Sequence, residues 1–252
     1  HANIENFRIP GDGRRFTELL TTPDELRRIA DVAEKYAIPT VKVTGGQRID
    51  LLGVKKADLP GVWADLGMPS GHAYGKSIRT VKTCVGSEHC RFGTQQSMSM
   101  GVALEKMLYG MGAPHKVKLA VSGCPRNCAE AGIKDVGVIG VDSGWEIYVA
   151  GNGGIKTEVA QFLCKVKTRE EAMEVTAAFL QLYREEGWYL ERTVHYVQRV
   201  GLDHVKQAVV EDMEKRRALH ARLLHALKDY EDPWRAAVEQ PLVRREFEPL
   251  EV

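Results

Sequence analysis

Two close pairs of cysteines constrain this chain more than any other feature. Cys84 and Cys90 stand in the run TCVGSEHC with five residues between them, and Cys124 and Cys128 stand in SGCPRNC with three. Four thiolates on two short segments indicate one metal or iron–sulfur site. Zinc sites favour about two to four residues between paired cysteines, so the wider first loop suits two corners of a larger cluster better.

Disulfides explain this pattern poorly. The chain has five cysteines, an odd number, and its N-terminus carries no secretory signal. Gly86, Gly93 and Gly123 adjoin the pairs and permit close approach of the backbone. Ordinary buried cysteines are the less favoured alternative. A zinc-stabilised scaffold and a haem-free iron–sulfur carrier stay open. Cys164, in the apolar run QFLCKV, is expected in the core rather than among the ligands.

Composition narrows the class of protein. The formal net charge of +1 over 252 residues indicates neither a nucleic-acid nor an anionic-membrane partner. No apolar run approaches the length of a membrane span, and no targeting signal appears, so a cytoplasmic enzyme is expected. The chain begins at His1 rather than at a methionine, which indicates processing, a tag or a piece of a longer protein.

The pattern of elements predicts an α+β fold in three parts. Residues 14–67 form a small β-α-β-β-α unit, in which Thr22 and Glu25 make a capping box around Pro23. The strands are IPTVKVT and QRIDLLGV, and the helix in ADLPGVWADLG is expected to break at Pro60.

Residues 76–200 form the larger second part. A helix in SMSMGVALEKMLYGMG is expected behind the first cysteine loop, strands in KVKLAVSG, KDVGVIGV and WEIYVAGNGG, and a helix from Thr168, boxed by Glu171, to Gly187. Residues 201–252 form a helical extension, with one long amphipathic helix over residues 203–231. We expect that helix to pack on its own domain, and a partner contact is the alternative.

These cysteine motifs, with SGC before the second pair and GNGG after it, resemble the sirohaem and [4Fe–4S] domain of nitrite and sulfite reductases. The stretches RTVKTCVGSEHCRFGTQQS, APHKVKLAVSGCPRNCAEAGIKDVGVIG and GWEIYVAGNGG look most like the C-terminal reductase part of assimilatory NAD(P)H-dependent nitrite reductase large subunits. The likeness runs from about Arg14 to about Lys206. It implies a ferredoxin-like half-module over residues 14–67 and a sirohaem/[4Fe–4S] domain over residues 76–200.

The resemblance implies a cofactor pair and its ligands. Cys84, Cys90, Cys124 and Cys128 would ligate the [4Fe–4S] cluster, and Cys128 would also bridge to the sirohaem iron. Thiolate ligation favours electron flow toward the open face of the iron, where the substrate anion binds.

Cations near the cysteines would serve the anion and the macrocycle, which carries carboxylates. Arg79, Lys116 and Lys118 match the family's anion-binding and proton-delivering residues, and the alternation in HKVKLAV puts both lysines on one face of a strand. A solvated surface charge is the ordinary alternative for any one of them. The residues assigned to the cofactor surface are Arg91, Arg126, Asn127 and Asn152.

One motif departs from the family. Where the family carries T-T-R-Q, this chain has Thr44, Gly45, Gly46, Gln47 and Arg48, so a glycine takes the arginine's place. Arg48 follows the glutamine and is assigned to the cofactor surface in its stead. A plain turn is an equal explanation for the two glycines.

The implied reaction is the six-electron reduction of nitrite to ammonium, with sulfite reduction to sulfide as the alternative. No dinucleotide-binding fingerprint occurs in the sequence, so the electrons would come from another domain or protein. The family often encloses the haem with two such modules, and this chain has one. A second module gained by oligomerisation is therefore expected.

Overall fold

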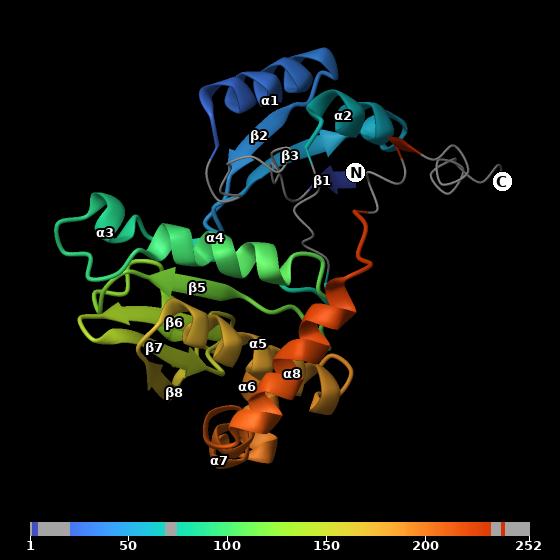
Figure 1. Cartoon of the computed structure of the whole chain (residues 1–252). Helices are drawn as coiled ribbons and strands as arrows, with labels where there is room; N and C mark the ends of the chain where they lie inside the picture. Colours follow the sequence, from blue (N-terminus) through green and yellow to red (C-terminus); the bar gives the residue numbers. More distant parts are fainter. Residues whose placement is uncertain (1, 5–20, 69–74, 233–237, 240–252) are drawn as a thin grey trace. The chain divides into compact units, whose positions relative to one another are not determined.

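The computed structural model describes residues 2–4, 21–68, 75–232 and 238–239. The chain divides into two compact units, residues 1–73 with 230–252 and residues 74–229 (Figure 1). Within the described residues, no helix has both the length and the hydrophobicity needed to cross a bilayer.

The smaller unit is an antiparallel sheet with two helices on the same side of it (Figure 1). Its strand order is β1-β3-β2, from Ala2–Ile4, Ile49–Val54 and Thr40–Val43. The helices are α1 (Pro23–Lys35) and α2 (Leu59–Leu66). Apolar residues of both helices, among them Ile29, Trp63 and Leu66, pack with Leu51 of β3.

The start of α1 confirms the predicted capping box. The Thr22 hydroxyl accepts from the Glu25 amide at 3.2 Å, the Glu25 carboxylate accepts from the Thr22 amide at 2.6 Å, and Pro23 opens the helix. The prediction for Pro60 was wrong. Pro60 lies in the first turn of α2, after the 3-10 turn η1 (Lys56–Asp58), where its missing N–H has no helical partner to lose.

The first strand of this unit, β1, lies ahead of the module expected over residues 14–67. Residues 14–20 of that expected module lie outside the described residues.

The larger unit is built on a mixed sheet of order β4-β5-β6-β7-β8. The strands are Lys82–Thr83, Leu119–Ser122, Val136–Val141, Gly144–Val149 and Gln161–Val166. Strands β4, β5 and β6 run parallel to one another, whereas β7 runs antiparallel to both of its neighbours, β6 and β8. The carboxyl ends of β4 and β5 therefore meet at one edge of the sheet, and their amino ends at the opposite edge.

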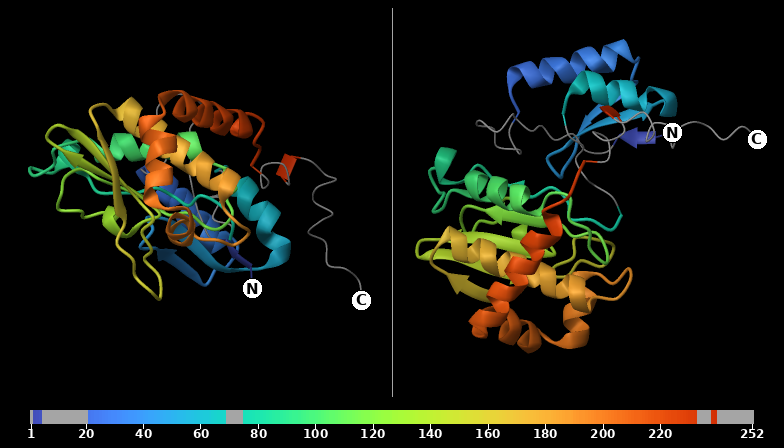
Figure 2. Two further views of the ribbon diagram at one scale, coloured as in Figure 1. Left: turned by 90° about the horizontal axis from the view of Figure 1, so that it is seen from below. Right: turned by 45° about the vertical axis from the view of Figure 1, so that its right-hand side comes forward.

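The two faces of this sheet differ. On one face of the sheet, helices α4 (Ser97–Leu108) and α5 (Arg169–Glu186) form the main core together with the strands. Helix α8 (Met213–Leu227) lies against α5 (Figure 2). The other face has small residues, and Ala120 packs there with Ala129 and Ala131 of the loop that carries the second cysteine pair. Small side chains leave room for that loop to lie directly on the sheet.

The C-terminal part of this unit corrects the prediction of one long helix. It consists of α6 (Thr193–Val200), α7 (Leu202–Lys206), a π-helical turn (Gln207–Glu211) and α8. The break falls at Asp212, whose carboxylate accepts from the Lys215 amide at 2.8 Å and caps α8. The predicted packing on its own domain is confirmed, since Val205, Val209, Leu219 and Leu223 are buried in the main core.

Candidate functional site

Both cysteine pairs begin where parallel strands end. Cys84 directly follows β4, and Cys124 lies two residues beyond β5. The Cys84 amide donates to the Val121 carbonyl at 3.3 Å, and the Gly123 amide donates to the Cys84 sulfur at 3.1 Å. All five cysteines are free thiols. The parallel pairing thus brings two segments that are far apart in sequence to one edge of the sheet.

The two cysteine loops touch backbone to backbone. A Cβ atom at Gly123 would lie 2.7 Å from the Gly86 Cα and 2.8 Å from the Gln95 carbonyl oxygen. Gly86 has φ +56°, a conformation that L side chains rarely adopt. The amides of Thr94 and Gln95 both donate to the Gly123 carbonyl, at 2.8 and 2.9 Å. These glycines allow the two segments that carry the four thiols to pack against each other.

Two polar residues support the first loop and were not singled out from the sequence. The hydroxyl of buried Ser97 donates to the Cys84 carbonyl at 2.8 Å and lies 3.2 Å from the Cys84 sulfur. In the short helix α3 (Gly86–His89), Glu88 accepts from the Ser99 amide at 3.1 Å. A serine at a helix start and a glutamate in a short helix are ordinary features, so nothing in the sequence marked them.

Asn127 shapes the second loop around Cys128. It adopts φ +57°, and its side-chain oxygen accepts from the Ser122 hydroxyl at 3.3 Å and the Gly132 amide at 3.2 Å. These bonds fold the loop back over the sheet and leave Cys128 exposed. The side-chain oxygen of Asn127 therefore holds the loop, and its contact with a cofactor remains a prediction.

The thiol set suits a cluster better than one metal ion. A polynuclear cluster holds its cysteines farther apart than one tetrahedral ion does. Four unpaired thiols on two packed loops, from buried Cys124 to exposed Cys128, fit such a cluster.

Cations gather around the cysteine loops. The guanidinium carbons of Arg91 and Arg126, one from each loop, lie 4.5 and 3.8 Å from the centre of the exposed Phe92 ring. Lys134 and Lys82 pair with Glu130 at 2.9 and 3.1 Å and lower the pKa of that carboxyl. The first two cations remain open to solvent and available to an anionic ligand.

The predicted anion-binding residues lie at the other edge of the sheet. The strand starts later than predicted, at Leu119, so Lys116 and Lys118 precede β5. The alternation still holds, because both lysines are half-buried and flank fully buried Val117. The Arg79 amide donates to the Val117 carbonyl at 2.8 Å. Arg79, Lys116 and Lys118 are thus brought together at the amino ends of β4 and β5.

A buried carboxylate organises this amino-terminal edge. Asp135, directly before β6, is 1% exposed and accepts from the Lys118 amide at 2.8 Å. It also accepts from Arg192 Nη2, at 2.9 and 3.0 Å to its two oxygens, and from the Thr193 hydroxyl. The sequence gave no signal for Asp135 or Arg192, because they are 57 residues apart.

The charges at this edge act on one another. Burial lowers the pKa of Lys118, the nearby cations Lys116 and Arg192 lower it further, and Asp135 raises it. Burial also lowers the pKa of His115, as do Arg192 and Lys116. The His115 Nδ1 accepts from the Lys116 amide at 2.7 Å, so its proton is carried on Nε2.

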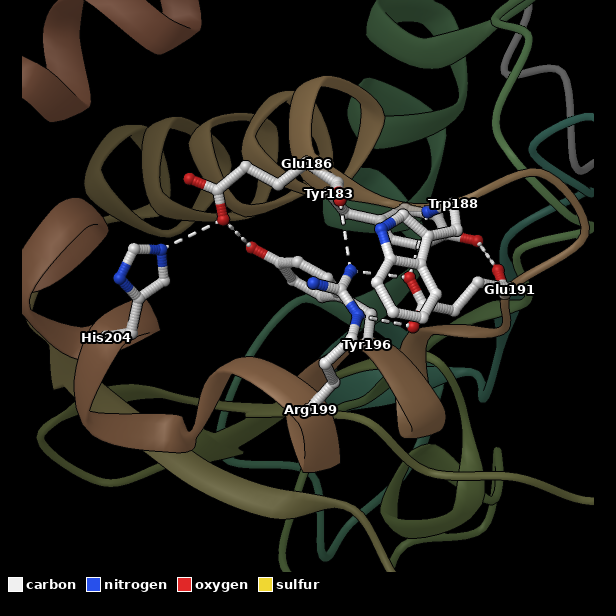
Figure 3. Close-up of polar contacts among 7 residues, drawn as sticks. All are labelled: Tyr183, Glu186, Trp188, Glu191, Tyr196, Arg199 and His204. Atoms are coloured by element: carbon white, nitrogen blue, oxygen red, sulfur yellow. Dashed lines mark hydrogen bonds and ion pairs between the residues drawn. The ribbon is translucent and has the colours of Figure 1, made fainter.

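A hydrogen-bonded loop fixes the chain before Arg192 (Figure 3). The Glu191 carboxylate accepts from Arg199 Nε and Nη2 at 2.8 and 2.7 Å and from the Trp188 amide at 2.9 Å. The Tyr183 hydroxyl donates to the Glu191 carbonyl. The Leu190 amide donates to the Pro114 carbonyl at 3.1 Å, which ties this loop to the segment carrying Lys116 and Lys118.

Two further predicted residues lie in turns. Arg48 lies in the β2–β3 hairpin of the smaller unit, where its side chain folds over Gly46 and its buried Nε meets no acceptor among the described residues. Asn152 closes a loop through reciprocal backbone bonds with Glu158 at 3.0 and 2.9 Å. Gly151 lies against protein backbone, since its amide donates to the Lys134 carbonyl at 2.9 Å.

Comparison with known proteins bears on both units. Residues 74–217 match the family described as the nitrite and sulphite reductase 4Fe-4S domain, and residues 19–68 match the nitrite/sulfite reductase ferredoxin-like half domain. The NAD(P)H nitrite reductase of Bacillus subtilis strain 168 is 56% identical over 98% of this chain. This chain spans 31% of that relative's length.

Two further relatives extend the comparison. The assimilatory-type sulfite reductase of Nitratidesulfovibrio vulgaris is 36% identical over 76% of this chain and 88% of its own length. Among solved structures, dissimilatory sulfite reductase I superposes with a TM-score of 0.70 at 16% identity, covering 80% of this chain and 67% of that one. The structural likeness concerns the fold.

Proposed function

The chain belongs to the nitrite and sulphite reductase family, and on this basis we propose that it is a catalytic module that reduces nitrite to ammonium. The observation that carries the proposal is the packing of the two cysteine loops through Gly86 and Gly123, which brings the two segments that carry the four free thiols to one sheet edge. The 56% identity to a nitrite reductase, against 36% to a sulfite reductase, favours nitrite over sulfite.

The residues at this edge would hold the family's cofactor pair. Cys84, Cys90, Cys124 and Cys128 would ligate a [4Fe–4S] cluster, and exposed Cys128 would also face the sirohaem iron. When bound, the pair supplies six electrons to the substrate in single steps. Arg91 and Arg126 would pair with carboxylates of the macrocycle, and Asn127 and Asn152 would line the same surface. The assignment of Arg48 to a cofactor stays a prediction.

The cations at the other edge would hold the substrate. Arg79 keeps its charge and can bind two oxygens of one anion, whereas a lysine can release a proton. Lys118 suits proton delivery, because burial and its cationic neighbours lower its pKa. Lys116 beside it would stabilise the negative charge that develops as oxygen leaves.

These two sets of residues stand at opposite ends of the same strand. Lys118 directly precedes β5, Cys124 lies two residues beyond it, and four residues of strand alone span ~13 Å. One small anion cannot contact the residues at both ends of this strand at once. We infer that the cations of one copy face the cysteine loops of a second copy, so that two copies form two complete sites. Electrons would enter from a donor domain or protein.

Mixing two inactive variants tests this arrangement. Lys118→Met and Cys128→Ser, each produced alone, are expected to lose turnover. Co-produced, they should recover up to about a quarter of the wild-type rate, since a random dimer can hold one intact site. The pair Cys124→Ser and Cys128→Ser should recover nothing. A fully active monomer in solution, or no recovery in the first mixture, would refute the shared site.

The reaction itself is tested on purified protein. We expect isobacteriochlorin absorption, about four cluster irons with acid-labile sulfide per chain, and ammonium produced from nitrite with a chemical reductant. Cys128→Ser should abolish turnover, whereas Cys164→Ser should not. Faster reduction of sulfite than of nitrite would select the alternative substrate. A cluster without macrocycle would indicate an electron carrier, and zinc alone would overturn the mechanism.

A further inference from the structure

Positive charge exceeds negative charge at the amino ends of β5 and β6. Lys116, Lys118 and Arg192 adjoin Asp135, whereas the nearby Lys134 is paired with Glu130. Asp135 is the carboxylate that partly offsets these cations, and it raises the pKa of Lys118. This excess of charge favours a bound anion.

Arg192, beside these cations, is incompletely paired. Its side chain is 14% exposed, and both of its contacts with Asp135 run through Nη2. Its Nε is buried and donates to no acceptor among the residues that the structure describes. A buried donor without an acceptor is costly, and an anionic oxygen would supply the missing acceptor.

A second buried arginine in the same unit shows the ordinary arrangement. Arg216 of α8 is 8% exposed, and its Nε donates to Glu174 of α5 at 2.7 Å. The two arginines therefore share burial and a carboxylate partner. They differ in the Nε–H group: that of Arg192 donates no hydrogen bond to the described residues, whereas that of Arg216 donates to Glu174.

We propose that Arg192 is a further anion-binding residue of this site and that Asp135 is the residue that positions it. The inference rests on the proposed function, since it adds Arg192 to the residues that hold the anion. Asp135 binds the Lys118 backbone amide and the Arg192 guanidinium together, so it fixes the backbone at Lys118 relative to that guanidinium. The chemistry recognised is an oxyanion, supplied by the substrate or by a carboxylate of the macrocycle.

Contacts within the protein fix the position of Arg192. It is the N-cap residue of α6, and the preceding loop is held by the Glu191–Arg199 pair (Figure 3). Thr193 adds a hydroxyl bond to Asp135. An arginine held in this way loses little conformational freedom when an anion binds.

The test compares Arg192→Gln and Arg192→Lys with the matched controls Arg216→Gln and Arg216→Lys in the cofactor-loaded protein. Nitrite binding is measured by calorimetry, KM and kcat by turnover with a chemical reductant, and sirohaem by absorbance per chain. We expect Arg192→Gln to weaken nitrite binding about 10- to 100-fold, with incomplete rescue in Arg192→Lys. Both controls should stay within about twofold of wild type.

Each outcome decides between sources of the anion. Weaker nitrite binding at unchanged sirohaem content assigns Arg192 to the substrate. Reduced sirohaem content with unchanged nitrite affinity per haem assigns it to a macrocycle carboxylate. If affinity, KM and sirohaem content all match the Arg216 controls, the proposal is wrong.

Folding is controlled by the double variant Asp135→Asn with Arg192→Gln, which removes both charges together. It should unfold at a temperature close to wild type and still bind nitrite weakly; wild-type affinity in this variant would overturn the proposal. A wild-type protein that binds nitrite without reducing it would refute the proposed reaction while the binding comparison still tests Arg192. Wild-type protein that binds neither nitrite nor sulfite would refute both.

Discussion

The two ends of the parallel strands β4 and β5 are built on different principles. At the carboxyl ends, backbone lies on backbone, since Gly123 approaches Gly86 too closely for any side chain, and the cysteine thiols are left unpaired. At the amino ends, charged side chains surround the buried carboxylate of Asp135. The first end depends on space and the second on charge pairing, so different substitutions should damage each.

The largest effect is expected from Gly123→Ala. Its new methyl group would meet the Gly86 Cα at 2.7 Å and the Gln95 carbonyl oxygen at 2.8 Å, so one of the cysteine loops must move. Bound iron per chain, measured by colorimetric assay, should fall at least about tenfold. Gly112→Ala is the control, since its nearest neighbour would be the Lys76 oxygen at 3.8 Å. Equal iron in both variants would show that the contact between the loops does not matter.

The next largest effect is expected at the amino ends of the strands. Asp135→Asn leaves the Arg192 guanidinium buried without a counter-charge and should lower the free energy of unfolding by about 3 kcal/mol. Chemical denaturation measures it. Glu130→Gln, in the second cysteine loop, is the contrast: Glu130 pairs with two lysines but is 53% exposed, so about 0.5 kcal/mol is expected. Similar losses in the two variants would contradict the difference between the ends.

A smaller effect is expected at Ser97. Its hydroxyl bonds the Cys84 carbonyl and lies within hydrogen-bonding distance of the sulfur, so Ser97→Ala should make the cluster's reduction potential more negative and cost about 1 kcal/mol of stability. Redox titration followed by visible absorption measures the potential. Ser99→Ala, in the same helix turn but bonded to the Gln96 carbonyl, should leave it unchanged. The same potential in both variants would show that Ser97 acts on folding alone.

The sequence predicted the features that depend on local order. The capping boxes at Thr22 and Thr168 formed as expected, because each joins residues three apart. Strands β2, β3, β5, β6 and β7 lie in the runs where strands were predicted, and Cys164 lies in the core of β8 as expected. The candidate site was identified from the cysteine spacing, because this spacing can be read from the sequence without knowledge of the fold.

Features that depend on distant partners could not be predicted. Asp135 and Arg192 are 57 residues apart, and neither lies in a pattern that marks a pair. The break at Asp212 was missed because the apolar period continues across it: Val209 before and Leu219 after are both buried. The separation of the cations from the cysteines appears only when the strand between them is in place, because in the sequence Lys118 and Cys124 are neighbours.

The smallest effect on the cysteine site is expected from the fifth cysteine. It tests whether a thiol can bind the cluster because it lies at a strand end, rather than because it is a cysteine. Cys164 lies within β8, and burial raises the pKa of its thiol to about 11. At pH 8 only about one molecule in a thousand then carries the reactive thiolate. In cluster-free protein treated with iodoacetamide, peptide mass spectrometry should find exposed Cys128 modified and Cys164 protected until the protein is unfolded. Cys164→Ala should keep the full iron content and lose about 1 kcal/mol of stability. Rapid modification of Cys164 in the folded protein, or loss of iron in the alanine variant, would show that thiols outside the strand ends also belong to the site.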